Sequence, residues 1–124
     1  MKGNGILIVE DDRDASGLLA RMISRRYPAT SVYSAANGRK GLEAFLQFFP
    51  EVVITDITMP EMNGLQMAHR IGALSPETRL IAMSANLERL TTSSGIRPVS
   101  FDHYFTKPVN LSDIFSALND ILQK

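Results

Sequence analysis

The sequence of 124 residues contains no cysteine, so it offers no disulfide framework, no thiolate metal site and no cysteine nucleophile. It also lacks a net charge, because 13 basic residues balance 13 acidic ones. Domains that bind nucleic acid normally show a basic excess, so we expect no direct DNA or RNA partner. No apolar run approaches the roughly 20 residues that cross a bilayer, and the start is not typical of a signal peptide. These absences predict a soluble protein of a reducing compartment, the cytoplasm.

What the sequence does contain is an apolar fraction of 44% and a charged fraction of 21%, which is typical of a globular domain. A chain of this length fits one domain and buries roughly two-thirds of its unfolded surface. No internal repeat, low-complexity tract or linker composition interrupts it. We therefore expect one domain over residues 1–124, with any output supplied by a partner or by sequence outside these residues.

Short apolar runs alternate along the chain with longer amphipathic stretches. The apolar runs predict five β-strands, at residues 6–9, 31–35, 52–55, 80–83 and 103–106. The run at 31–35 is the more polar one, so we place it toward a sheet edge. The amphipathic stretches predict five helices, which run from about Ala15 to before Pro28, from the N-cap Asn37 through Phe49, over 65–74, briefly after Leu87, and onward from the cap Asn110.

This alternation predicts an α/β fold, a doubly wound parallel sheet with helices on both faces. In such sheets, ligands bind outside the carboxyl ends of the strands. The polar residues at those ends are Glu10, Asp11 and Asp12 after the first strand, Asp56 after the third, Ser84 after the fourth and Lys107 after the fifth. Several carboxylates, a hydroxyl and an ammonium are therefore expected to converge at one edge.

The chemistry of this set favours a metal and a phosphate. Clustered carboxylates repel one another unless a cation is present, and oxygen ligands without histidine or cysteine favour a hard ion such as Mg²⁺. Magnesium usually coordinates phosphate oxygens at the positions that the protein leaves open, and a nearby lysine can also bind phosphate. A carboxylate beside the metal can attack phosphorus and form an aspartyl phosphate. Phosphoryl transfer chiefly needs positioning and charge neutralisation, which this set can supply.

Each of these residues also has a purely structural interpretation. Asp and Ser are common at strand ends because turns and helix N-caps favour both. The acids at residues 10–12 also suit the positive end of a helix. The functional interpretation rests on the conjunction of complementary groups from different strands at one end of the sheet.

Four segments in order resemble those of the receiver domain of two-component response regulators, and the likeness runs through nearly all of the chain. They are 6–12, with an acidic pair; 53–64, with a Met-Pro-x-Met-x-Gly loop; 81–85, with a switch hydroxyl; and 101–108, with a switch aromatic and Lys-Pro. The resemblance implies the flavodoxin-like strand order 2-1-3-4-5 of receivers. The run 101–110 looks more like receivers attached to hybrid histidine kinases.

The resemblance also implies roles for the site residues. Asp56 would accept a phosphoryl group from a sensor histidine kinase or a histidine phosphotransfer protein. Glu10 and Asp11 would form the acidic pair that holds Mg²⁺, with Asp11 bound directly and Glu10 partly through water. Asp56 and the backbone carbonyl of Thr58 would be further metal ligands. Lys107 would pair with Asp56 and then with the phosphoryl oxygens.

The same resemblance implies how the signal would leave the site. Ser84 would hydrogen-bond the phosphoryl group, and Tyr104 would then turn inward. The surface of the fourth helix, fifth strand and fifth helix would change, so that phosphorylation biases a two-state equilibrium. Such a chain is not an enzyme, because it catalyses only its own phosphorylation and dephosphorylation.

Some residues need separate interpretations. Asp12 falls one place beyond the acidic pair and is better explained as an acid at a helix start. The Lys107–Pro108 bond is expected to be cis, because the family has that bond. Many receivers have Gly-Ala where Ser100 and Phe101 stand, and this departure puts the usual output surface in question. The last helix lacks the arginine that many DNA-binding regulators use to dimerise, so the oligomeric state stays open.

Other functional classes remain as alternatives. In a haloacid-dehalogenase-like aspartyl phosphatase, Asp12 would be the nucleophile in place of Asp56, although the chain is short for that family. In a flavodoxin-like electron carrier, an FMN phosphate would lie on the loop after the first strand, where three acids would repel it. A pseudo-receiver that takes no phosphoryl group is disfavoured by the intact Asp56, Ser84 and Lys107.

Overall fold

The computed structural model describes residues 5–57, 64–84 and 101–122, and it contains one parallel sheet of five strands in the order β2-β1-β3-β4-β5. The strands are β1 (Gly5–Val9), β2 (Ser31–Ala35), β3 (Val52–Asp56), β4 (Arg79–Ser84) and β5 (His103–Thr106). The predicted α/β class, strand number and strand order are confirmed. The more polar β2 lies at one edge, as predicted, because an edge strand has only one neighbour to cover it.

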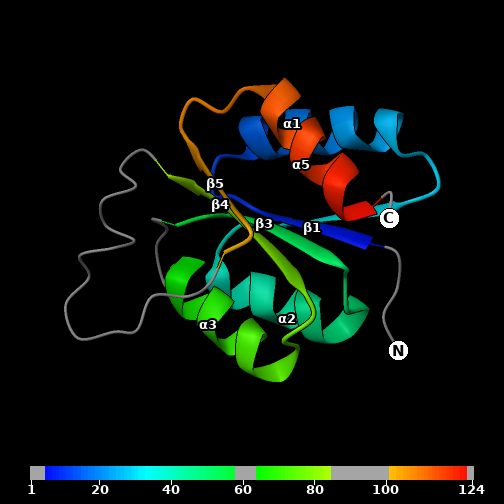
Figure 1. The fold of residues 1–124 in the computed structure, drawn as a ribbon. Coiled ribbons are helices and arrows are strands. Elements are labelled where there is room, and N and C mark those ends of the chain that lie inside the picture. Colours follow the sequence, from blue (N-terminus) through cyan, green and yellow to red (C-terminus); the bar gives the residue numbers. More distant parts are fainter. Residues whose placement is uncertain (1–4, 58–63, 85–100, 123–124) are drawn as a thin grey trace.

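Four helices in the described ranges cover the two faces of the sheet. They are α1 (Arg13–Arg26), α2 (Gly38–Phe48), α3 (Gly64–Leu74) and α5 (Leu111–Leu122). Figure 1 shows α1 and α5 on one face and α2 and α3 on the other. The short helix predicted after Leu87 falls outside the described residues. Within the same ranges, no helix is both long and apolar enough to cross a membrane.

Two apolar cores result, one on each face of the sheet. Alternate residues of a strand point to opposite faces, so Ile6 and Ile8 of β1 pack against α1 and α5. Leu7 and Val9 pack on the other side, against α2 and α3. All four side chains have no exposed surface. This burial on both faces is why the first strand reads as an unbroken apolar run.

Polar side chains define where the helices begin. The Asp12 carboxylate accepts hydrogen bonds from the backbone N–H groups of Asp14 and Ala15, so α1 starts slightly before the predicted Ala15. The predicted cap Asn37 accepts the backbone N–H of Lys40 at 2.8 Å. The predicted cap Asn110 accepts the backbone N–H of Ser112 at 2.9 Å. Each acceptor satisfies a donor that the first turn of a helix leaves unpaired.

Gly64 lets α3 begin directly against the end of β3. Its backbone N–H donates to the Ile57 carbonyl at 2.9 Å. A Cβ atom added at Gly64 would lie 2.1 Å from the Asp56 carbonyl oxygen and 2.9 Å from the Ile57 Cα. Both atoms belong to the backbone, so neither can rotate away.

We therefore predict that Gly64→Ala lowers the free energy of unfolding by about 1–3 kcal/mol through overpacking. Gly72, in the same helix, is the matched control, because a Cβ there meets no atom within 4 Å. Gly72→Ala should instead raise that free energy by about 0.5–1 kcal/mol, through helix propensity. Urea unfolding followed by circular dichroism measures both. Equal effects at the two positions would contradict the packing argument.

Candidate functional site

The carboxyl ends of neighbouring strands bring the predicted polar residues to one edge of the sheet. Glu10 and Asp11 follow β1, Asp56 ends β3 and Ser84 ends β4. Lys107 follows β5, and its backbone N–H donates to the Ser84 carbonyl at 2.9 Å. Because β1 pairs with β3, β3 with β4 and β4 with β5, the sheet order itself places these residues next to one another.

Lys107 joins two carboxylates that come from different strands. Its Nζ atom lies 2.8 Å from Asp56 Oδ2 and 2.8 Å from Glu10 Oε1. Asp56 is 7% exposed and Glu10 is 4% exposed, so both acids lie almost entirely below the surface. Buried carboxylates need such partners, because an unpaired charge in the interior is costly.

The site remains richer in negative than in positive charge. One carboxylate oxygen from each of Glu10, Asp11 and Asp56 lies within 4.8 Å of the others. Among the described residues of the site, the Lys107 ammonium pairs with Glu10 and Asp56, so one positive charge stands beside three carboxylates. A donor set made only of carboxylate oxygens suits a hard divalent cation, and its compactness is consistent with Mg²⁺.

Burial and pairing act on the two titratable groups in the middle of the site. Burial raises the pKa of the Glu10 carboxyl above its ordinary value, while the hydrogen bond from Lys107 opposes that rise. For Lys107, burial alone would lower the pKa of the ammonium. Its hydrogen bonds to Asp56 and Glu10 outweigh burial and leave that pKa above its ordinary value. Lys107 is therefore held as a cation between the two acids.

Asp12 lies outside the cluster formed by Glu10, Asp11 and Asp56. Its carboxylate caps α1 through the N–H groups of Asp14 and Ala15. This is the helix-start interpretation that the sequence favoured. A haloacid-dehalogenase-like site would need Asp12 as nucleophile, and the acids gathered around Lys107 do not include it.

The remaining predicted residues lie at different depths. Ser84 is 2% exposed at the end of β4, beside the site, whereas Tyr104 on β5 is 46% exposed. Thr58 falls outside the described residues. The Lys107–Pro108 bond is cis, as the resemblance implied. Asp56, Ser84 and Lys107 thus lie together at the carboxyl ends of their strands, and Tyr104 lies within β5, the outermost strand of the sheet.

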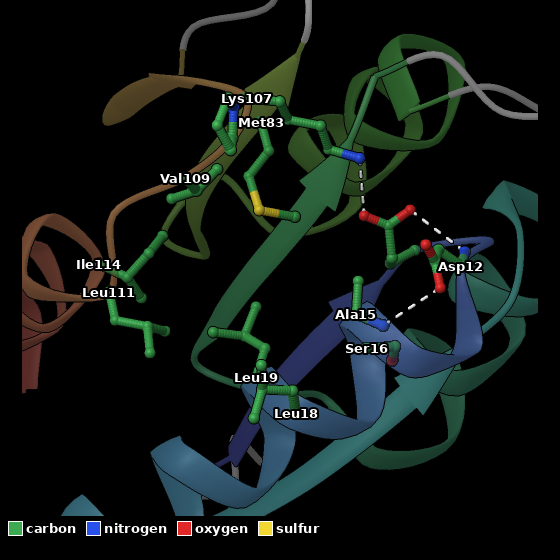
Figure 2. Close-up of a pocket in the computed structure, with 12 residues that line it drawn as sticks. Asp12, Ala15, Ser16, Leu18, Leu19, Met83, Lys107, Val109, Leu111 and Ile114 are labelled. Atoms are coloured by element: carbon green, nitrogen blue, oxygen red, sulfur yellow. Dashed lines mark hydrogen bonds and ion pairs between the residues drawn. The ribbon is translucent and has the colours of Figure 1, made fainter.

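An apolar groove of about 600 Å³ begins at this site and runs between α1 and α5. Figure 2 shows Leu18 and Leu19 of α1 on one side, Leu111 and Ile114 of α5 on another, and Lys107 at the upper end. Leu18 is 49% exposed. Helical periodicity does not reveal how far apart two helices lie, so this groove could not be predicted from the sequence.

Comparison with known proteins agrees with this architecture. Residues 6–119 match the family model for the response regulator receiver domain. Chemotaxis protein CheY of Thermotoga maritima is 31% identical over 120 residues, which cover 96% of this chain and 98% of that protein. The uncharacterized transcriptional regulatory protein YesN of Bacillus subtilis is 30% identical over 118 residues, which cover 94% of this chain but only 32% of YesN.

Among solved structures, the response regulator protein TrrA from Thermotoga maritima, crystallised in complex with Mg²⁺-BeF, superimposes with a TM-score of 0.82. The two chains are 25% identical, and the match covers 98% of this chain and 100% of TrrA. The family match spans most of the sequence, and the strand order and the edge at which the acids gather agree with it. The chain therefore belongs to the response regulator receiver domain family.

Proposed function

We propose that this receiver domain is a phosphorylation-controlled switch in which Asp56 accepts a phosphoryl group from a phosphohistidine. The observation that carries the proposal is the position of the Asp56 carboxylate. The Asp56 side chain is almost completely buried, and its Oδ2 atom lies 2.8 Å from Lys107 Nζ. One Asp56 oxygen also lies within 4.8 Å of a carboxylate oxygen of Glu10 and one of Asp11. A carboxylate placed beside a cation and a potential metal site suits nucleophilic attack on phosphorus.

The chemistry needs few protein groups. An Asp56 oxygen attacks phosphorus, the bond from phosphorus to the donor's imidazole nitrogen breaks, and its electron pair stays on that nitrogen. Lys107 moves from the carboxylate toward the phosphoryl oxygens and neutralises part of their charge. Attack by water on phosphorus later releases inorganic phosphate and restores the carboxylate. The domain thus catalyses only its own phosphorylation and dephosphorylation and turns over no separate substrate.

Asp11 would bind the metal directly and Glu10 partly through water, with Asp56 and the carbonyl of Thr58 as further ligands. Bound Mg²⁺ would offset the repulsion between the incoming phosphoryl oxygens and the three carboxylates. Ser84 would then hydrogen-bond the phosphoryl group, and Tyr104 would turn inward to alter the surface around β5 and α5.

The wider setting follows from the family. The phosphodonor would be a sensor histidine kinase or a histidine phosphotransfer protein of a cytoplasmic two-component system. Residues 1–124 would act as one receiver domain, and the output would be a separate protein or a further domain. The short share of YesN that this chain spans agrees with receivers that act as parts of longer proteins.

The groove between α1 and α5 offers a docking surface for the phosphodonor protein. A protein that brings phosphohistidine to Asp56 must cover the surface beside the site, and the groove opens there with Lys107 and Glu10 in its wall. Half-exposed Leu18 gives that surface apolar area that a docked partner can remove from water. We therefore propose that an apolar helix face of the donor packs across Leu18.

The first prediction concerns the acceptor. With acetyl phosphate and Mg²⁺, the parent protein should acquire an acid-stable, hydroxylamine-sensitive phosphate. Asp56→Asn should reduce this labelling by at least about 100-fold, because it replaces the nucleophilic carboxylate with a neutral amide. Asp12→Asn is the matched control and should keep the label. Labelling that is lost in Asp12→Asn and kept in Asp56→Asn would instead favour the phosphatase-like alternative.

The second prediction concerns the metal. At ten times its dissociation constant, Mg²⁺ should raise the free energy of unfolding by about 1.4 kcal/mol. Asp11→Asn should unfold at a higher temperature than the parent in EDTA, because it relieves repulsion with Glu10 and Asp56, yet lose most of the Mg²⁺ effect. Asp120→Asn, an exposed acid on α5, should keep that effect. Thermal unfolding with and without Mg²⁺ tests this, and an unchanged Mg²⁺ response in Asp11→Asn would refute the assignment.

The third prediction concerns docking. Leu18→Ala should lower the rate of transfer from a phosphorylated histidine phosphotransfer protein by about tenfold relative to the rate with acetyl phosphate. Leu74→Ala is the control, because Leu74 is 58% exposed but lies on α3, across the sheet. If the two variants change the ratio of rates equally, the groove is not the docking surface.

A further inference from the structure

Tyr104 on β5 contacts Phe101. The two rings meet edge to face, with their centroids 5.5 Å apart and their planes at 68°. The Phe101 backbone N–H also donates to the Tyr104 hydroxyl oxygen at 3.4 Å. Tyr104 remains 46% exposed, whereas Phe101 is only 7% exposed and belongs to the core cluster that includes Leu80 and Ala82. The exposed ring therefore rests on a buried one.

Phe101 cannot follow Tyr104 if that side chain turns, because the next residue is tied to β4. The Asp102 carboxylate accepts the Leu80 backbone N–H at 2.8 Å, and the Asp102 N–H donates to the Leu80 carbonyl at 2.8 Å. The other carboxylate oxygen lies 3.0 Å from Arg79 Nε. An inward turn of Tyr104 must therefore break both the ring contact and the hydrogen bond that Phe101 provides.

We propose that Phe101 is a positioning residue that holds Tyr104 outward and so lowers the population of the inward state in the unphosphorylated domain. This inference rests on the proposed function and deepens it. A contact made only in the outward state lowers the population of the inward state, and an edge-to-face pair is worth a factor of about 2 to 10. A bound phosphoryl group or its mimic favours the inward state. By linkage, a contact that disfavours that state reduces the apparent affinity of the domain for the mimic by the same factor.

The test is Phe101→Leu, which keeps an apolar side chain in the core but removes the aromatic edge. Beryllofluoride with Mg²⁺ is the probe, and its apparent dissociation constant should fall by about 2- to 10-fold. The chain has three tyrosines and no tryptophan, so fluorotyrosine labelling yields three ¹⁹F resonances. Without beryllofluoride, the Tyr104 resonance of the variant should move toward its position in the beryllofluoride complex.

A second aromatic pair supplies the control. Phe48 stacks on Tyr33 with ring centroids 4.1 Å apart, at the β2 edge of the sheet. Phe48→Leu removes a comparable contact and should leave both the affinity for beryllofluoride and the Tyr104 resonance as in the parent. If Phe101→Leu does not fold, Phe101→Met, whose unbranched side chain adapts to irregular space and equally lacks a ring, takes its place.

The outcomes separate the inference from the function beneath it. If the parent fails to bind beryllofluoride, the proposed function fails and the inference falls with it. If the parent binds but Phe101→Leu changes only the unfolding temperature, with affinity and Tyr104 resonance unchanged, Phe101 has a purely structural role and only the inference is overturned. Tighter binding together with a shifted Tyr104 resonance supports it.

Discussion

The structure around the site depends on the two ion pairs of Lys107. Asp56 and Glu10 lie almost wholly buried at the ends of different strands, and each has an oxygen 2.8 Å from the same ammonium. Removing one partner of such a group leaves an uncompensated buried charge, which is strongly destabilising. The ammonium thus balances part of the charge that makes this edge of the sheet suitable for a cation and a phosphate.

The parallel sheet is what makes that arrangement possible. With β1 beside β3 and β3 beside β4, short apolar runs end together, and the first polar residue after each run arrives at the same edge. The two cores hold the strands in this register, since a slip by one residue would turn buried side chains to the opposite face. Gly64 then allows α3 to begin close to the Asp56 carbonyl.

Much of this could be predicted from residue patterns. Buried strands appear as unbroken apolar runs, and Asn37 and Asn110 are side chains that suit helix starts, so the elements were predicted correctly within the described residues. The half-exposed position of Leu18 was not predicted, because periodicity identifies a helix face but not the distance to the next helix. The contact of Phe101 with Tyr104 was missed as well, since the sequence marked Phe101 only as a departure from a common family pattern.

By itself the sequence determined the alternation of elements, the absence of thiol chemistry, the balance of charge, and which carboxylates, hydroxyl and lysine end the strands. These properties are local, because they follow from residue type and spacing along the chain. Only the tertiary structure decided that Lys107 bridges Glu10 and Asp56 and that Tyr104 rests on Phe101. Those outcomes depend on distances between residues far apart in sequence or on side-chain orientation, which packing of the whole sheet and its helices sets.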